Sequence, residues 1–466
     1  MQHFDVIILG SGPGGYVASI RAAQLGMKTA IVEKESIGGI CLNWGCIPTK
    51  SLLNNAKILQ SIKKNGELFG VKNQDIKVNY PKILYKSRTI VDKLKKSVSF
   101  LIKKNGVHVI FGNAQLKKRK KIEIFKNEKS IGEYSASNIV IATGAIPKID
   151  TRFQYDRKKI ITYKEALSLS SLPKKMIIVG SGSIGLEFAY FYHSMGTKVT
   201  VIEVCSKLYP NGDDDISDYL KHYFDKIGIQ NYVSSSINKI TYNNETFEII
   251  VDIKTPLENI VLKTDTILSA IGVVPNIKYI GLEEVGIQTE RGFIVVDENY
   301  RTNIDGYYAI GDVINTPSLA HVASHEAINC IENIKGLNCQ KINYNNVPKC
   351  VYSLPEMASV GYTEKESKEK GFKIKVGKFP FSALGRSISD ENTDGFVKVI
   401  FDDKYDEWLG CHMIGNHVTD LISEVVVARK LETTSYEILG SIHPHPSLSE
   451  SIIESIANAY GKAIHL

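Results

Sequence analysis

A stretch of 27 residues occurs twice in this chain, and the repeat constrains the fold more than any other sequence feature. Residues 7–33 read IILGSGPGGYVASIRAAQLGMKTAIVE, and residues 177–203 read IIVGSGSIGLEFAYFYHSMGTKVTVIE. The copies align without a gap at an offset of 170 residues, and 9 of the 27 positions are identical. Each contains an apolar strand, a G-x-G-x-x-G turn, a helical stretch, a second apolar strand and a final glutamate. The chain is therefore predicted to hold two βαβ units of the α/β class.

The glycines and the glutamate of each copy predict a dinucleotide site. The first glycine of such a turn permits a tight bend, the second lets the backbone approach a pyrophosphate, and the third lets helix and strand pack closely. These positions are Gly10, Gly12 and Gly15 in the first copy and Gly180, Gly182 and Gly185 in the second. Glu33 and Glu203 lie 23 residues after the first glycine, where a carboxylate accepts hydrogen bonds from ribose hydroxyls. Because a carboxylate repels a 2′-phosphate, Glu203 predicts NAD rather than NADP.

Two further segments predict that the first site binds FAD. Residues 139–147 form an apolar strand that is expected to end at Thr143 and Gly144. Residues 302–313 form a second strand that is expected to end at Gly311 and Asp312, where the carboxylate could bind a sugar-chain hydroxyl of a flavin. The alternative for Asp312 alone is a loop or helix-capping residue.

Two cysteines lie five positions apart in GGICLNWGCIPTKSLL, residues 38–53. Cys41 and Cys46 could be metal ligands, buried apolar residues or a redox pair. A zinc site normally needs a second close pair. The other cysteines form none; they are Cys205, Cys330, Cys339, Cys350 and Cys411. A regular helix holds residues five apart at roughly 8–9 Å, whereas a disulfide needs Cα atoms within about 4.4–6.8 Å. An oxidised pair would therefore require an irregular turn, which Gly45 can supply, followed by a helix through TKSLLNNAKIL.

Length and composition narrow the function classes. The chain has 466 residues, which suggests two to four domains. The N-terminus shows no secretory signal and no apolar run is long enough to span a bilayer, so we expect a cytoplasmic, bacterial protein whose cysteines stay in a reducing compartment. The net charge is +7, but the basic stretch LKKRKK has no interleaved aromatic residues and no nucleic-acid motif. We expect neither a nucleic-acid nor a membrane partner.

The motifs together resemble the flavoprotein disulfide reductases, most closely the dihydrolipoamide dehydrogenase branch of that family. The similarity covers essentially the whole chain, and it rests on GSGPGGYVASIRAAQLG, CLNWGCIPTKSLL, GSGSIGLEFA, TNIDGYYAIGD, YSLPEMASVGYTE and HPHPSLSE. It implies an FAD domain at 1–146, an NAD domain at 147–271, a central domain at 272–340 and a dimerisation domain at 341–466. The fold class implied is α/β, with two Rossmann-like domains and a C-terminal α+β domain. Short alternating strands after residue 341, then helices from about 417, agree with this division.

The resemblance assigns roles around the cysteine pair. It implies that Cys41 exchanges with the substrate and that Cys46 lies against the flavin. Lys50, one turn after Cys46, lies near the flavin in such proteins and pairs with a glutamate that matches Glu187 here. A cation at that place would lower the pKa of a thiolate.

The resemblance also assigns a base. His445 in HPHPSLSE is followed five residues later by Glu450, and a carboxylate that holds a histidine orients a general base. In the family the matching histidine reaches the dithiol of the neighbouring subunit, so a homodimer is expected. Ala320 and His321 open a helix that is expected to point at the flavin through its backbone. The cofactor-binding set is completed by Gly14, Ala142 and Gly272, and no metal is expected.

The implied reaction is oxidation of protein-bound dihydrolipoamide, with FAD and NAD as cofactors. The implied partners are the lipoyl domains and acyltransferase core of a 2-oxo acid dehydrogenase complex, or a glycine cleavage carrier protein. Glutathione-type reductases would show basic residues just after Glu203, and mercuric reductases would carry a further cysteine pair near the C-terminus; neither feature is present. A structural subunit or a flavin-based sensor is the non-catalytic alternative, and the intact Cys41, Cys46, His445 and Glu450 argue against it.

Overall fold

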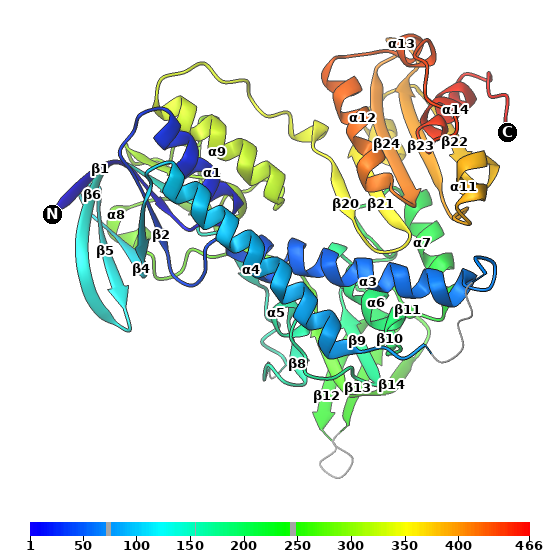
Figure 1. Cartoon of the computed structure of the whole chain (residues 1–466), viewed down its shortest axis with the longest axis horizontal. Coiled ribbons are helices and arrows are strands. Elements are labelled where there is room, and N and C mark those ends of the chain that lie inside the picture. The colour runs from blue at the N-terminus through cyan, green and yellow to red at the C-terminus, as the bar shows by residue number, and fades with distance from the viewer. Residues whose placement is uncertain (71–75, 154, 243–247) are drawn as a thin grey trace. The chain divides into compact units, whose positions relative to one another are not determined.

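The computed structural model describes residues 1–70, 76–153, 155–242 and 248–466, and it divides into two compact units (Figure 1). Unit 1 contains Met1–Ser51, Leu84–Lys148 and Gly272–Tyr344. Unit 2 contains Leu52–Ile83, Ile149–Ile271 and Asn345–Leu466. Unit 1 thus draws mainly on the ranges expected for the FAD and central domains, and unit 2 on those expected for the NAD and dimerisation domains. The four domain boundaries themselves stay a prediction.

Unit 1 is built on a mixed sheet that starts with the first βαβ copy. Its strands, in spatial order, are β3 (His108–Phe111), β2 (Thr29–Glu33), β1 (Gln2–Leu9), β6 (Lys129–Ile141), β5 (Lys121–Lys126) and β4 (Asn113–Lys117), and β19 (Tyr307–Ala309) also pairs with β6. The strands β3, β2, β1, β6 and β19 are parallel, and in their register Ile8 pairs with Ile31 and Val140. Helices α1 (Pro13–Gln24) and α9 (Ala320–Ile334) pack side by side and bury alanines in the same core (Figure 1). The carboxyl end of β1, at Leu9, leads directly into the first glycine turn, which begins at Gly10.

Two strands of unit 1 are shorter than the sequence predicts. The strand expected to end at Thr143 and Gly144 ends at Ile141, and Ala145–Pro147 forms a separate strand, β7, paired with β16 (Val273–Pro275). The reason is Gly144, whose φ of 70° turns the chain between them. The strand expected over 302–313 is reduced to β19, and Gly311–Val313 forms a 3-10 turn. Unit 1 also contains α8 (Leu282–Val285), β17 (Thr289–Glu290) and β18 (Phe293–Ile294).

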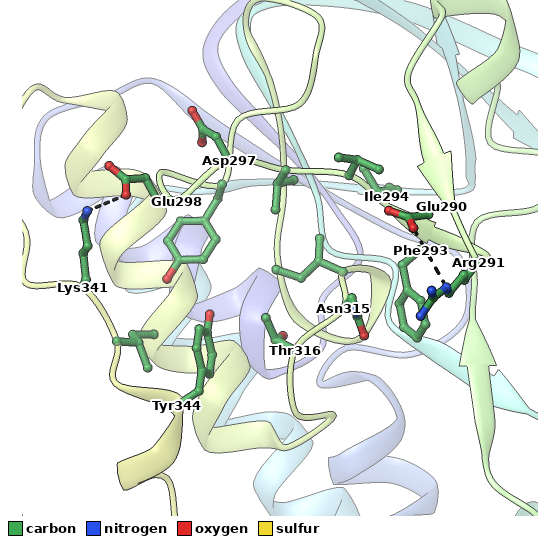
Figure 2. Close-up of a pocket in the computed structure, with 15 residues that line it drawn as sticks. Glu290, Arg291, Phe293, Ile294, Asp297, Glu298, Asn315, Thr316, Lys341 and Tyr344 are labelled. Carbon is green, nitrogen blue, oxygen red and sulfur yellow. Dashed lines mark hydrogen bonds and ion pairs between the residues drawn. The ribbon is translucent and has the colours of Figure 1, made fainter. Parts of the chain in front are cut away.

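A cavity of about 490 Å³ lies in unit 1 beside β18 and the segment that follows the 3-10 turn (Figure 2). Tyr300, Thr316 and Tyr344 line it, and an ion pair between Glu298 and Lys341, 2.5 Å apart, lies at its edge. None of the predicted site residues is among its lining residues. We therefore do not assign the predicted chemistry to this cavity.

Unit 2 contains the second βαβ copy in a parallel sheet. Its strands, in spatial order, are β11 (Gln230–Tyr232), β10 (Lys198–Ile202), β9 (Lys175–Val179), β15 (Thr266–Ser269) and β8 (Ile160–Ile161). A three-stranded antiparallel sheet follows, made of β12 (Ser236–Tyr242), β13 (Ile249–Lys254) and β14 (Asn259–Thr264). The helices are α5 (Tyr163–Ala166), α6 (Ser183–Ser194) and α7 (Asp214–Ile227). Most residues of α6 are buried, so this helix is apolar around most of its circumference.

The C-terminal part of unit 2 is an antiparallel sheet covered by helices (Figure 1). Its strands, in spatial order, are β20 (Lys349–Val351), β21 (Glu356–Gly361), β24 (Trp408–Gly415), β23 (Phe396–Asp402) and β22 (Ile374–Pro380). Its helices are α10 (Glu364–Glu369), α11 (Gly385–Ser389), α12 (Val418–Lys430), α13 (Ser435–Leu439) and α14 (Glu450–Ala459). Helix α12 packs on β21 and β24, and α14 packs on β22 and β23. The predicted strands GFVKVIF and WLGCHMIG and the helices after 417 are confirmed.

Three more helices carry the cysteine segment and its continuation. They are α2 (Gly39–Trp44), α3 (Cys46–Asn65) and α4 (Tyr80–Lys104). The helix predicted through TKSLLNNAKIL is confirmed as part of α3. Within the described ranges, no helix combines the length and the apolar character that crossing a membrane requires. The predicted α/β class, with two βαβ units and a C-terminal α+β part, is confirmed.

Candidate redox and dinucleotide sites

The two G-x-G-x-x-G turns have the same geometry. Gly10 and Gly180 have φ values of 98° and 101°, a region that favours glycine. A Cβ on Gly15 would lie 1.9 Å from the carbonyl oxygen of Gly10, and a Cβ on Gly185 would lie 2.0 Å from that of Gly180. Glycine is therefore required at these positions in both copies, because any side chain would collide with backbone.

The helices that follow these turns leave their first amides available to an anion. Gly12 and Gly182 are the N-cap residues of α1 and α6, and no described side chain caps either helix. A Cβ on Gly12 would meet only the Cα of Gly39, 4.0 Å away, and a Cβ on Gly182 would meet none of the described atoms within 4 Å. Open backbone at a positive helix end fits a pyrophosphate in both copies.

The glutamate of each copy is held by the serine of its own turn. The amide and hydroxyl of Ser11 donate to Glu33 Oε2 at 3.0 and 2.5 Å. The amide and hydroxyl of Ser181 donate to Glu203 Oε2 at 2.7 and 2.8 Å. Burial alone would raise the pKa of Glu203, but hydrogen bonds from Ser181 and the Cys205 amide lower it. Glu203 is thus an oriented, charged carboxylate, as a ribose contact requires. The serines were missed from the sequence, although their identity in both copies was the available signal.

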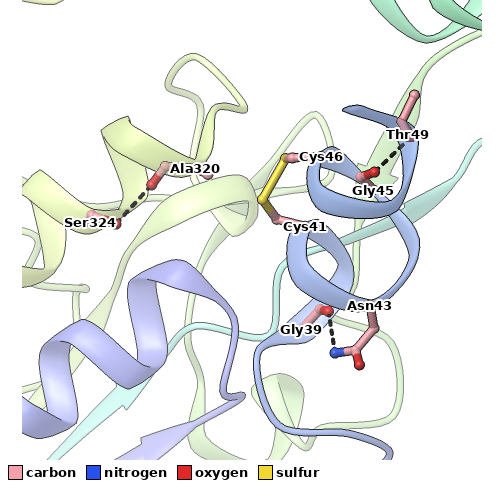
Figure 3. The surroundings of a disulfide bond; sticks show 8 residues. All are labelled: Gly39, Cys41, Asn43, Gly45, Cys46, Thr49, Ala320 and Ser324. Atoms are coloured by element: carbon pink, nitrogen blue, oxygen red, sulfur yellow. Dashed lines mark hydrogen bonds between the residues drawn. A yellow bond between two sulfur atoms is a disulfide. The ribbon is translucent and has the colours of Figure 1, made fainter. Parts of the chain in front are cut away.

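Cys41 and Cys46 form a disulfide with a Cα–Cα distance of 4.8 Å (Figure 3). Helix α2 ends at Gly45, whose φ and ψ are −134° and −117°, and α3 begins at Cys46. The predicted irregular turn at Gly45 is confirmed. The carbonyl oxygen of Gly45 accepts hydrogen bonds from the amide and hydroxyl of Thr49, at 3.1 and 2.7 Å, so the break leaves this partly buried group paired.

The disulfide segment packs on the first dinucleotide turn. Gly38 and Gly39 have φ values of 98° and 62°, and a Cβ on Gly39 would lie 2.5 Å from the Cα of Gly12. The Gly38 amide also donates to the hydroxyl of Ser11 at 3.2 Å. The side chain of Asn43 donates to the carbonyl oxygen of Ile37 at 3.0 Å. It also donates to the carbonyl oxygen of Gly39 at 2.9 Å (Figure 3). The positive φ values and this close contact explain why two glycines stand before the cysteines. The sequence alone did not reveal this reason.

The residues expected around a flavin occupy one end of the main sheet of unit 1. Thr143 and Gly144, which follow Ala142 and β6, are both hydrogen-bonded to Asn276. The Thr143 hydroxyl donates to the carbonyl oxygen of Asn276 at 2.8 Å. The Asn276 amide donates to the carbonyl oxygen of Gly144 at 2.8 Å. Gly272, with φ 109°, carries a carbonyl oxygen that accepts from the Lys148 amide at 3.0 Å. Asn276 was missed, because nothing near it in the sequence marks a clamp.

Asp312 lies in a buried acidic environment. Burial, together with the nearby Glu326 carboxylate, raises the pKa of Asp312 to about 6. Glu326 is fully buried and accepts hydrogen bonds from the Gly311 amide at 2.7 Å and the Tyr344 hydroxyl at 2.9 Å. A hydroxyl-rich ligand would supply the donors that a largely desolvated Asp312 carboxylate needs, so the position of Asp312 fits the predicted flavin contact.

The first turn of α9 lies in the surroundings of the disulfide (Figure 3). Ala320 is the first helical residue and His321 the second, and the first turn contains no acidic residue. The hydroxyl of Ser324 donates to the carbonyl oxygen of Ala320 at 3.0 Å. The positive end of this helix would stabilise negative charge on a ligand beside the cysteines.

His445 and Glu450 are brought together as the sequence spacing suggests. His445 Nδ1 lies 2.8 Å from Glu450 Oε1, and the Ser447 amide donates to Glu450 Oε2 at 2.8 Å. The His445 side chain is 78% exposed. A second pair was missed: His443 Nε2 lies 2.6 Å from Glu424 Oε1, and His443 is mostly buried. The exposed ring of His445 is therefore held by the Glu450 carboxylate at Nδ1. The neighbouring His443 attaches the loop to α12 through Glu424.

Lys50 and Glu187 belong to different units. Lys50 lies in α3 within unit 1, and Glu187 lies in α6 within unit 2. Glu187 is buried and accepts a hydrogen bond from the Tyr352 amide at 3.1 Å. Their pairing stays a prediction. No cluster of three or more His, Cys, Asp or Glu side chains with a metal-binding arrangement is found in the described part of the chain.

The chain is similar over its whole length to known oxidoreductases. Residues 4–327 match the family model described as pyridine nucleotide-disulphide oxidoreductase, and residues 347–456 match its dimerisation domain. The chain is 43% identical to a dihydrolipoyl dehydrogenase of Rhizobium etli over 480 residues, covering 100% of this chain and 99% of that protein. It is 44% identical to the Zymomonas mobilis dihydrolipoyl dehydrogenase, with coverages of 100% and 99%.

Solved structures agree with these sequence relatives. The fold is similar to that of LpdA from Mycobacterium tuberculosis, with a TM-score of 0.89, 27% identity, and coverage of 98% of this chain and 99% of that one. It is also similar to the HOCl-induced flavoprotein disulfide reductase RclA from Escherichia coli, with a TM-score of 0.88, 25% identity and the same coverages.

Proposed function

The chain belongs to the pyridine nucleotide-disulphide oxidoreductase family, in the branch formed by the dihydrolipoyl dehydrogenases, and from this premise we propose how its residues act. The enzyme oxidises dihydrolipoamide through the Cys41–Cys46 disulfide and FAD and reduces NAD to NADH. The observation that carries this function is the disulfide, which lies in a segment packed on the first glycine turn. Gly39, which begins the helix that carries Cys41, packs on Gly12 of that turn, so the disulfide segment adjoins the proposed FAD site.

The glycine turns and their acids support two dinucleotide sites. FAD would be held by the first turn, Glu33, Thr143, Gly144 and Asp312, and NAD by the second turn and Glu203. The supporting observation is that backbone occupies the space a Cβ would need in both turns, beside helix ends without a side-chain cap. Bound at these residues, FAD would supply a two-electron acceptor for the dithiol and a hydride donor for NAD.

The remaining steps are thiol chemistry of the chain itself. His445 of the partner subunit takes the proton of one substrate thiol, and the thiolate attacks Sγ of Cys41. The Cys41–Cys46 bond breaks, and Cys46 leaves as a thiolate. The second substrate thiol then attacks the substrate sulfur bound to Cys41, which closes the lipoamide disulfide. One substrate proton ends on Cys41 and the other on His445, so atoms and charge balance.

Glu450 and Lys50 support these steps. Glu450 holds His445 by Nδ1, so that the other ring nitrogen can accept the proton. Lys50, paired with Glu187, is proposed to lower the pKa of the Cys46 thiol and favour its thiolate. Both roles follow from ordinary electrostatics, since each places an opposite charge beside the group that becomes charged.

We further propose a cytoplasmic homodimer that serves lipoylated partners. The match of residues 347–456 to a dimerisation domain supports the homodimer, and the dihydrolipoyl dehydrogenase relatives support a lipoyl substrate. The proposed partners are the lipoyl domains and acyltransferase core of a 2-oxo acid dehydrogenase complex, or a glycine cleavage carrier protein. A pull-down of the acyltransferase from the native cytoplasm would distinguish these partners.

The test is to mix the purified, FAD-loaded protein with dihydrolipoamide and NAD and to follow NADH. We expect NADH to form, and we expect little NADPH when NADP replaces NAD, because Glu203 repels a 2′-phosphate. Cys41→Ser and Cys46→Ser are the controls, and each should abolish the reaction. Absence of NADH from the FAD-loaded wild type would reject the proposed function.

A further inference from the structure

A buried lysine gathers three carboxylates where α7 meets the C-terminal sheet of unit 2. Lys398 lies on β23, and its side chain is only 2% exposed. Its Nζ lies 2.8 Å from Asp213 Oδ1, 2.6 Å from Asp215 Oδ2 and 2.8 Å from Glu364 Oε2. A charged ammonium is buried here only because acids surround it on several sides.

The three acids do not depend equally on Lys398. Asp215 also pairs with Lys378 at 2.6 Å, and Glu364 also pairs with Lys368 at 2.6 Å. Asp213 is 2% exposed, and among the described ion pairs its one cation is Lys398. Loss of Lys398 would therefore leave Asp213 as a buried carboxylate without a countercharge, the costliest kind of change in such a cluster.

Asp213 ends the loop that follows Glu203. It is the N-cap residue of α7, where its Oδ1 accepts from the Asp215 amide at 3.2 Å. The loop, residues 204–212, is pinned a few residues earlier, because the Tyr209 amide donates to Ser181 Oγ at 3.2 Å. The same hydroxyl donates to Glu203 at 2.8 Å. The Ser217 hydroxyl lies 3.4 Å from the carbonyl oxygen of Tyr209 and 3.2 Å from that of Asp213, and so links the two ends of this segment. A series of contacts thus leads from Lys398 to Asp213, through Ser217 to Tyr209, and through Ser181 to Glu203.

The first copy of the repeat shows what the loop does. There the Gly38 amide occupies the place of the Tyr209 amide, donating to Ser11 Oγ at 3.2 Å, and Ser11 holds Glu33. In the first copy the loop continues into α2 and the disulfide. In the second copy it continues into Asp213 and the ion cluster. Each loop fixes the serine–glutamate pair from one side, and each is fixed in turn by a different element.

We propose that Lys398 is a positioning residue for NAD, which anchors the loop 204–212 through Asp213 and so keeps Glu203 oriented toward the ribose. The inference rests on the proposed NAD site at Glu203. It assigns part of the cofactor affinity to a residue of the C-terminal sheet, and it gives the buried charge cluster a role in the reaction beyond holding α7 to that sheet.

The test compares Lys398→Met with Lys378→Met in the FAD-loaded protein. Both variants remove one lysine from the same cluster, but Lys378 is 45% exposed and its removal leaves Asp213 paired. Equilibrium titration with NADH should give a Kd raised about fivefold or more for Lys398→Met and nearly unchanged for Lys378→Met. The KM for NAD should rise while kcat and the KM for dihydrolipoamide stay constant.

Asp213→Asn keeps the test decisive if Lys398→Met does not fold. Asparagine caps a helix as well as aspartate does, and Lys398 would retain Asp215 and Glu364. We expect a smaller rise in the NADH Kd in the same direction. NADH binding equal to wild type in Asp213→Asn, or equal losses in the two lysine variants, would overturn the inference.

Glu203→Gln separates this inference from the proposed NAD site. If Glu203→Gln binds NADH as the wild type does, the NAD site itself is wrong. If Glu203→Gln weakens NADH binding while Asp213→Asn and the foldable lysine variants do not, the site stands and only the positioning role of Lys398 fails.

Discussion

Single carboxylates in this protein differ in charge state because their surroundings differ. Glu203 is kept ionised, since hydrogen bonds from Ser181 and Cys205 outweigh its burial. Asp312 is pushed the other way, since burial and the Glu326 carboxylate raise its pKa to about 6. Because its pKa is raised, Asp312 is ionised at neutral pH only at a cost in folding stability, which a cofactor that donates hydrogen bonds to the carboxylate would offset.

The first prediction concerns Asp312→Asn in the FAD-free protein. Because the folded pKa is raised from 3.8 to about 6, the wild type loses stability as pH rises through this window and gains none above it. Removing the charge should stabilise the protein by roughly 2–3 kcal/mol at about pH 7 and by almost nothing at about pH 4. Urea unfolding at the two pH values measures this difference.

A control and a second readout accompany Asp312→Asn. Asp305 is exposed and its pKa is lowered by the Lys120 ammonium, so Asp305→Asn should bring no stabilisation. Asp312→Asn should also weaken FAD retention, because the amide is a poorer acceptor. A variant less stable than wild type at neutral pH would contradict the account.

The second prediction concerns the carboxylate behind His445. Glu450→Gln should reduce kcat about tenfold or more, because the amide no longer stabilises a positive ring. Glu454→Gln is the matched control: Glu454 lies on the same helix and holds His465 at 2.6 Å, outside the proposed site. Steady-state kinetics should show full activity for the control, and equal losses in both variants would remove Glu450 from the site.

At the scale of the elements, helix α2 and the first glycine turn pack so closely that no side chain fits between them. At Gly39 a side chain would face both a positive φ and the Cα of Gly12 at 2.5 Å. Helix α2 can therefore begin only at a residue without a side chain, and this packing fixes its position beside the first glycine turn.

The third prediction compares Gly39→Ala with Gly26→Ala. Gly26 has φ 77° but nothing within 4 Å of a Cβ among the described atoms, so its substitution isolates the cost of the backbone conformation, about 1 kcal/mol. Gly39→Ala adds a backbone collision and should cost about 1–3 kcal/mol more, together with weaker FAD retention. Thermal unfolding and flavin release would measure both, and equal effects of the two variants would disprove the close contact.

Sequence reasoning succeeded where the signal is local. The repeat, the break at Gly45 and the pairing of His445 with Glu450 depend on residues close in sequence, whose spacing and special backbone needs can be read directly. It failed where partners are distant. Asn276 clamps Thr143 across 133 residues, and Lys398 pairs with Asp213 across 185. Such contacts arise from how sheets meet, which neither periodicity nor turn chemistry encodes.

At the scale of the whole molecule, the proposed reaction needs two chains. The disulfide lies in unit 1 and His445 in unit 2, and the C-terminal sheet and helices match a dimerisation domain. If each site combines cysteines of one subunit with the histidine of the other, defects in different residues can complement one another.

The fourth prediction follows from this shared site. Cys41→Ser and His445→Gln homodimers should both be nearly inactive. Unfolding and refolding them together as an equal mixture should restore about a quarter of wild-type activity, because half of the dimers are mixed and each mixed dimer keeps one intact site. Each variant refolded alone is the control. No recovery in a mixture that demonstrably contains mixed dimers would place His445 and its disulfide in the same subunit.

The central claim is that the two cysteines have unequal roles, Cys41 toward the substrate and Cys46 toward the flavin. The most direct measurement is to reduce the FAD-loaded protein with one equivalent of dihydrolipoamide, alkylate it briefly, and map the label by peptide mass spectrometry. The account predicts that Cys41 is labelled first while the long-wavelength absorption of a thiolate beside the flavin persists. Preferential labelling of Cys46, with loss of that absorption, would contradict it.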